Sequence, residues 1–80
     1  KMQYDLLTTV VLSKNLPEHK LKAGDVGAVV ECYGESAADV EFVTGAGRTL
    51  ALVTLQNNAV REIGESDVLS VRRSDSASVA

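Results

Sequence analysis

The sequence predicts an all-β domain, and three observations lead to this prediction. The apolar residues are chiefly Val, Leu and Ala, and the many β-branched valines favour strands over helices. Short apolar runs alternate with glycine-rich or polar breaks, the pattern that strands and turns produce. A long polar stretch follows the first run and closes with Gly24, Asp25, Val26 and Gly27. Five short strands with one long first loop predict a small SH3-like barrel.

The first strand is predicted at residues 6–12, a run rich in apolar and β-branched side chains. Residues 13–22 contain three lysines and the only proline, a composition typical of an exposed loop. Pro17 fixes its own backbone and biases Leu16 towards an extended conformation. We therefore expect an ordered loop that Leu16 and Leu21 fasten by packing on the end of the barrel.

The segment that closes this loop is predicted to serve the fold. Gly24 and Gly27 allow backbone angles and close approaches that other residues resist. Asp25 is expected to accept hydrogen bonds from nearby backbone amides, the usual role of Asp in a turn. Removing Asp25 should therefore reduce stability.

The second and third strands are predicted at residues 27–33 and 39–44, joined by the five-residue loop 34–38. Side-chain alternation favours a register in which Cys32 faces Val40 and Val30 faces Phe42, all on the core side. A shift of one residue would bury carboxylates, which disfavours it. The opposite, outer face then carries Glu31, Tyr33, Asp39, Glu41 and the apolar pair Val29 and Val43.

A glycine-rich turn at residues 44–48 leads into a fourth strand at residues 49–55. Leu50 and Leu52 are expected to face the core, and either Val53 or Leu55 joins them. The turn resembles a phosphate-binding loop only superficially. It joins two strands, opens no helix, and lacks the lysine and hydroxyl of that motif.

The C-terminal part is predicted to hold a single 3₁₀ turn at residues 56–59 and a fifth strand at residues 60–63. After a polar break, residues 68–72 alternate well enough for a short sixth strand. That strand either closes the barrel edge or pairs with a neighbouring chain. Residues 73–80 are rich in Ser and lack a periodic apolar pattern, which predicts a disordered tail after a single domain over residues 1–72.

Composition limits the classes of function. The net charge of -3 opposes general attraction to nucleic acid or to an anionic membrane. Cys32 is the only cysteine, so no intramolecular disulfide can form and a cytoplasmic location is expected. The run at residues 6–12 lacks the features of a signal peptide and is too short to span a bilayer. A chain of 80 residues is also near the size at which association often supplements stability, which favours a homo-oligomer.

No catalytic, cofactor-binding or metal-binding residue is predicted. Glu31, Asp39 and Glu41 would gather on one sheet face, but carboxylates on the open side of a sheet are ordinarily solvated. His19 is the only histidine, and Cys32 lies in a separate strand, so the two give no metal-ligand spacing. Cys32 is interpreted as a core thiol because apolar side chains are expected around it.

A protein-binding surface is the functional prediction that remains. Apolar side chains on the outer face and on the optional sixth strand would need a cover, which either the C-terminal segment or another chain provides. The candidate interaction surface consists of Val29, Glu31, Tyr33, Val43, Val68, Leu69 and Val71.

Several segments at a fixed spacing resemble a bacterial family of short proteins known only as a domain of unknown function. They read TVVL at residues 9–12, LPEHKLKAGDVGAVVE at 16–31, VEFV at 40–43, GRTLALVTL at 47–55 and VR at 60–61. The family typically reads LPEHGLKAGDVGTVVE and GRTLALLTL. Lys20 thus replaces a glycine, which puts a left-handed backbone there in question or under mild strain.

The resemblance implies an SH3-like barrel, and the Gly-Asp-Val-Gly segment is similar to the KOW element of ribosomal and transcription-elongation barrels. It implies no activity. Such proteins are often encoded in mobile or accessory gene regions, sometimes beside another small reading frame, and the resemblance thereby implies a paired partner protein. We therefore predict a non-catalytic, cytoplasmic protein-interaction module without a cofactor, self-associating or binding a neighbouring gene product. The alternative is a weak RNA-binding module of KOW type, through basic loops and an exposed aromatic.

Overall fold

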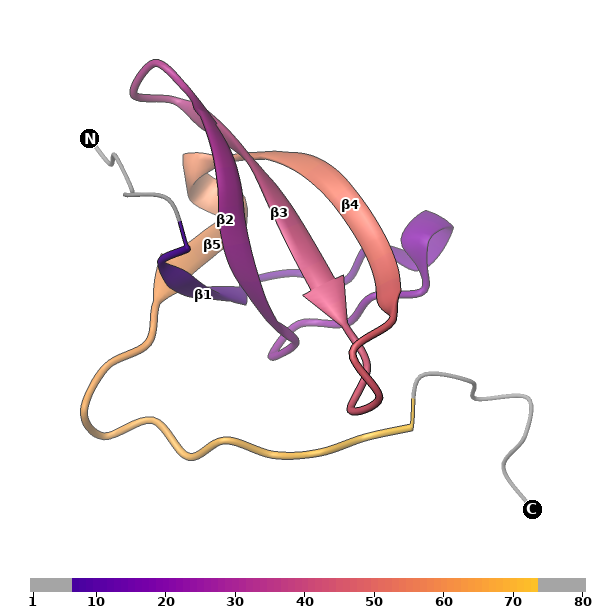
Figure 1. Ribbon diagram of the computed structural model, residues 1–80. Helices are drawn as coiled ribbons and strands as arrows, with labels where there is room; N and C mark the ends of the chain where they lie inside the picture. The colour runs from indigo at the N-terminus through magenta and orange to yellow at the C-terminus, as the bar shows by residue number, and fades with distance from the viewer. Residues whose placement is uncertain (1–6, 74–80) are drawn as a thin grey trace.

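The computed structural model describes residues 7–73, and it confirms the all-β prediction (Figure 1). No α-helix occurs within this range. The elements in chain order are β1 (Thr9–Leu12), the 3₁₀ helix η1 (Pro17–His19), β2 (Val26–Tyr33), β3 (Ala37–Val43), β4 (Thr49–Gln56), the 3₁₀ helix η2 (Asn57–Ala59) and β5 (Val60–Glu62).

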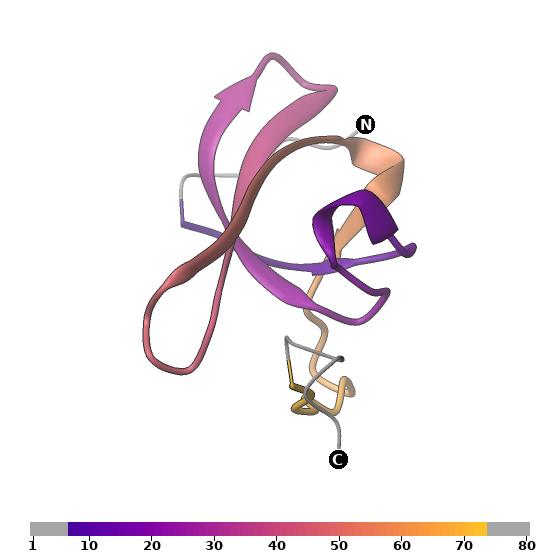
Figure 2. The same ribbon diagram turned by 90° about the vertical axis from the view of Figure 1, so that its right-hand side faces the viewer.

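The five strands form one antiparallel sheet in the order β4-β3-β2-β1-β5. Figure 2 shows how strongly this sheet curls around its inner face. Over residues 7–73 no strand ladder joins β4 to β5, so the hydrogen-bonded sheet is open between these two strands. The core fills the inner, concave side. Its largest fully buried side chains are those of Val10, Leu12, Leu21, Val29, Val40 and Phe42.

The loop between β1 and β2 is fastened as predicted. Leu16 and Leu21 form an isolated antiparallel bridge, in which each backbone N–H donates to the other residue's carbonyl oxygen at 2.9 and 3.1 Å. Leu21 is fully buried, and Leu16 packs against the core cluster. The loop between these two residues contains η1, and it is therefore anchored at both ends to the body of the domain.

Lys20 adopts the left-handed conformation that was in question, with φ 59° and ψ 33°. A side chain with a Cβ atom is strained there, whereas glycine is not. We expect Lys20→Gly to raise the free energy of unfolding by about 0.5–1 kcal/mol, since relief of strain exceeds the entropy that glycine adds to the unfolded chain. Urea denaturation measures this difference. Lys14→Gly, at an exposed loop position, is the control, and equal effects of both substitutions would contradict the interpretation.

The predicted register of the β2–β3 hairpin is wrong. Val29 lies opposite Val40, the position predicted for Cys32, and Val30 does not pair with Phe42. The ladder shifts at Val30, which is the extra residue of a β-bulge in β2. β3 begins at Ala37, so the connecting loop is also shorter than predicted.

The bulge reverses the alternation of side chains along β2. Before it, Gly27 and Val29 face the core, and after it Cys32 does. Val29 is fully buried, so its place on the candidate interaction surface and its outer-face pairing with Val43 are both wrong. Cys32 is half-buried and packs against the core cluster, as expected of a core thiol.

A second bulge changes β4 in the same way. The β3–β4 ladder shifts near the start of β4, where Leu50 is the extra residue. Leu50 packs against the core as predicted, but Leu52 is 59 % exposed. Val53 and Leu55 are buried instead. The prediction that Leu52 faces the core is therefore wrong.

Residues 68–72 form no strand, so the predicted sixth strand is absent from the described part of the chain. The segment after β5 begins with a turn in which the Asp67 backbone N–H donates to the Gly64 carbonyl oxygen at 3.1 Å. Figure 1 shows that the chain then runs in an extended path below the sheet. Val68, Leu69 and Val71 are exposed along it. Of the predicted tail, residues 74–80 lie outside the described residues.

Candidate interaction groove

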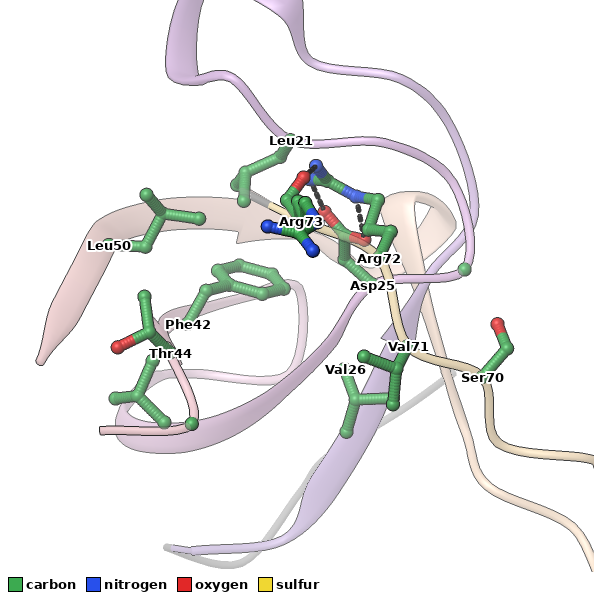
Figure 3. Close-up of a pocket in the computed structure, with 13 residues that line it drawn as sticks. Leu21, Asp25, Val26, Phe42, Thr44, Leu50, Ser70, Val71, Arg72 and Arg73 are labelled. Carbon is green, nitrogen blue, oxygen red and sulfur yellow. Dashed lines mark hydrogen bonds and ion pairs between the residues drawn. The ribbon is translucent and has the colours of Figure 1, made fainter. Parts of the chain in front are cut away.

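A groove of about 580 Å³ lies beside the extended C-terminal segment. The β1–β2 loop, the start of β2, the end of β3 and residues 70–73 form its walls, as Figure 3 shows. Its lining includes Leu21, Asp25, Val26, Phe42, Val43 and Leu50. The groove therefore joins parts of the chain that are distant in sequence.

An ion pair forms the polar end of the groove. The Arg72 guanidinium donates from Nε to Asp25 Oδ1 at 2.8 Å and from Nη2 to Asp25 Oδ2 at 2.5 Å. Nη2 also donates to the Lys20 carbonyl oxygen at 3.1 Å. The Lys22 backbone N–H donates to Asp25 Oδ2 at 2.9 Å, which confirms the predicted turn role of Asp25. The carboxylate is thus held by its own loop as well as by arginine.

Opposing influences act on the pKa of Asp25. Partial burial raises it, but the hydrogen bonds from Arg72 and from the Lys22 amide, with the positive charges of both residues, outweigh burial and leave the pKa below its ordinary value of 3.8. The hydrogen bond to Asp25 raises the pKa of Arg72. Asp25 is therefore an anion at neutral pH, in a position suited to a bidentate guanidinium.

The other end of the groove is apolar. Val26 is 38 % exposed and Val43 is 52 % exposed, although both lie at strand ends beside buried core residues. Val71 passes this surface on the C-terminal segment but is 99 % exposed. Among residues 7–73 no side chain covers this apolar wall, so it is available to a side chain from elsewhere.

The outer face of the sheet carries the predicted carboxylates. Glu31 and Asp39 are cross-strand neighbours, which agrees with their predicted place on one face of the sheet. The Tyr33 hydroxyl donates to Asp39 Oδ2 at 2.7 Å, and the Thr54 hydroxyl donates to Asp39 Oδ1. These bonds raise the pKa of Tyr33 and lower that of Asp39. The face is an exposed, hydrogen-bonded acidic surface and not an enclosed pair of carboxylates.

The seven residues of the predicted surface separate into four groups. Val29 is in the core, whereas Glu31 and Tyr33 lie on the outer face. Val43 and Val71 line the groove. The last group, Val68 and Leu69, is exposed on the C-terminal segment before it reaches the groove.

The pairing of Asp25 with Arg72 has no signal in the sequence, because 47 positions separate the two residues. The groove contains no metal-ligand cluster, and no group of three or more His, Cys, Asp or Glu side chains suited to a metal ion occurs within residues 7–73. His19 is exposed in η1. Over the same residues no helix is long and apolar enough to cross a membrane.

Comparison with protein families gives one match, to the family described as "Domain of unknown function (DUF4926)", over residues 6–62. This is more than half of the chain. The chain belongs to the DUF4926 family. Comparisons with curated proteins and with solved structures give no significant match. The matched residues end with β5, so Arg72 lies outside the DUF4926 region while Asp25 lies inside it.

Proposed function

We propose that this DUF4926 protein is a non-catalytic, cytoplasmic protein-interaction module that binds through the groove. The partner is a second copy or a separately encoded protein. The observation that carries the proposal is the combination of exposed apolar walls at Val26 and Val43 with a partly buried carboxylate at Asp25. Protein interfaces combine an apolar centre with a few fixed polar groups in this way.

The proposal includes an SH3-like barrel as the fold class. Three features support it: the strand order β4-β3-β2-β1-β5, the long loop between β1 and β2, and the 3₁₀ helix η2 between β4 and β5. The strong curl of the sheet brings its two edges towards one another (Figure 2). This arrangement leaves loops at the ends of the barrel, where binding residues commonly lie on a rigid scaffold.

RNA binding is the second candidate. The observation that favours it is that Lys20, Lys22 and Arg73 lie around the same end of the domain as Arg72. However, Asp25 already neutralises Arg72, and Tyr33 stands among carboxylates on the outer face. Phosphate groups are repelled by such a face. A single-stranded RNA titration at low and physiological salt belongs in the same set of experiments, and no binding at low salt removes this candidate.

Substitution of Val43 tests the groove as a protein-binding surface. We expect Val43→Asp to weaken self-association, or capture of the neighbouring gene product, by about tenfold or more, because it places a charge in an apolar contact. Sedimentation equilibrium and a pull-down measure these quantities. Leu52→Asp is the matched control, since Leu52 is similarly exposed but lies on the outer face.

Two results would contradict this assignment. Equal weakening by Val43→Asp and Leu52→Asp would mean that the groove has no special role. A wild-type chain that stays monomeric at high concentration and captures no neighbouring gene product would overturn the proposed function itself.

A further inference from the structure

The C-terminal segment is held beside the groove at two points. At its start, Arg61 donates two hydrogen bonds to the Asp67 carboxylate, at 2.8 and 3.0 Å, and the Gly64 backbone N–H donates a third at 2.6 Å. These contacts lower the pKa of Asp67 to about 2. At its end, the segment is held by the Arg72 guanidinium. Between these points Val68 and Leu69 are largely exposed, so a single side chain fixes the segment in the groove.

The site that receives Arg72 is built by the β1–β2 loop alone. Asp25 is oriented by the Lys22 backbone N–H, and the Lys20 carbonyl oxygen points to the same guanidinium. Arginine presents its donors in a rigid planar fork that matches a carboxylate in two parallel hydrogen bonds, which lysine cannot do. The loop therefore provides a subsite for arginine whether or not Arg72 occupies it.

The chain's own segment uses only this subsite. Val71, next to the arginine, is 99 % exposed and does not cover the apolar wall at Val26 and Val43. The segment also lies outside the residues that match the DUF4926 domain, whereas the loop and both valines lie inside them. An occupant with the same arginine and a larger apolar neighbour would bury surface that residues 7–73 leave exposed.

We propose that the groove recognises an extended peptide segment of a partner protein that carries an arginine beside a large apolar residue, and that residues 70–73 act as a built-in competitor. This inference rests on the proposed protein-binding function and names the ligand class. The guanidinium binds Asp25 and the Lys20 carbonyl oxygen, and the apolar side chain packs on Val26 and Val43. Arg72 must leave before the partner segment enters.

The competitor is weak enough to be displaced. A short flexible connection gives an intramolecular ligand an effective concentration in the millimolar range. One ion pair with little apolar burial gives low affinity, so the segment should reduce the apparent affinity for a partner by about tenfold. Removal of the Arg72 side chain should therefore raise the apparent affinity for a partner by about tenfold.

The experiment uses the full chain and a fluorescent, end-capped peptide with the sequence of residues 68–73, in which leucine replaces the second valine. Anisotropy titration compares the wild type, Arg72→Ala, and Arg72→Ala combined with Asp25→Asn. We expect Arg72→Ala to bind about tenfold more tightly than the wild type, and the double variant to lose this binding. A peptide with lysine in place of both arginines should bind the Arg72→Ala chain at least tenfold more weakly.

Arg48→Ala is the control. It removes the same charge at an exposed position that does not line the groove, and the described contact of Arg48 involves only its carbonyl oxygen, which accepts from the Thr44 backbone N–H at 2.9 Å. It should leave peptide affinity at the wild-type value. Thermal melts of each variant establish that the fold is retained. Equal affinity of the wild type and Arg72→Ala, or undiminished affinity of the double variant, would overturn the proposal.

Two further outcomes separate this inference from the proposed function. If Arg72→Ala binds no peptide while Val43→Asp still weakens association, the groove binds protein but the ligand class is wrong. If a chain with Asp25→Arg forms a stable heterodimer with a chain with Arg72→Asp, the occupant is the C-terminal segment of a second copy, which overturns the partner peptide.

Discussion

Replacement of Gly27 by alanine is expected to destabilise the domain by about 2–3 kcal/mol. A Cβ atom at this position would lie 2.6 Å from Val40 Cγ1, 2.9 Å from Phe42 Cε2 and 3.0 Å from the Glu41 carbonyl oxygen. Both side chains are buried in the core, and the carbonyl belongs to the β3 backbone, so none of these atoms can move freely. Urea denaturation monitored by circular dichroism measures the loss.

The location of Gly27 in the sheet explains this close approach. It lies opposite Val10 of β1 and next to Ala28, which pairs with both β1 and β3. Core side chains and the β3 backbone approach Gly27 closely, and glycine is the residue that tolerates such an approach. Gly24 is required for a different reason. Its φ of 97° is left-handed, a conformation that favours glycine, whereas an added Cβ atom would meet nothing within 4 Å.

A matched glycine and a compensating substitution make this prediction specific. Gly45→Ala should change stability by less than about 0.5 kcal/mol, since a Cβ atom added at this position in the exposed β3–β4 turn would meet nothing within 4 Å. Val40→Ala in the Gly27→Ala background should recover part of the loss by vacating the nearest contact. If both glycine variants are equally stable, close packing at Gly27 is not the reason for its presence.

The sequence was sufficient to predict the five strands of the sheet, the 3₁₀ turn before β5 and the anchoring of the first loop. It failed at the faces of β2 and β4, and both failures have one physical cause. Val30 and Leu50 are the extra residues of two β-bulges. Each reverses the alternation of inward and outward side chains in the rest of its strand. Valine and leucine fit either face of a strand, so no residue type marks the position of the bulge.

The candidate site was only partly predictable for a different reason. Val43 and Val71 were identified as exposed apolar residues, and both line the groove. Asp25 was assigned a turn role from local sequence, and it has that role. The second role of Asp25 is to bind Arg72, and it depends on the path of the chain after β5. There the chain forms no strand and places Arg72 beside the β1–β2 loop. Such long-range pairing of two charges has no periodic signal in a single sequence.

Asp25→Asn is expected to lower the free energy of unfolding by about 1–2 kcal/mol at neutral pH. The amide keeps the size of the side chain and can still accept the Lys22 N–H bond, but it loses the charge that Arg72 requires. The Asp25 side chain is only 16 % exposed, so solvent screens this pair less than it screens a surface ion pair. Chemical denaturation at pH 7 measures the difference, and Glu35→Gln, an exposed carboxylate in the β2–β3 loop, is the control.

The same substitution has a defined pH dependence. The pKa of Asp25 in the folded chain lies below the ordinary value of 3.8, so the ionised form stabilises the fold fully above that pH. The contribution of the Asp25 carboxylate to the free energy of unfolding is lost as the pH falls below 3.8 and through the pKa of Asp25 in the folded chain. The difference between the wild type and Asp25→Asn should therefore be constant from pH 7 to about pH 5 and shrink on further acidification. A difference that persists undiminished at about pH 2 would show that the charge of Asp25 does not cause it, and the Arg72 subsite would then lose its electrostatic basis.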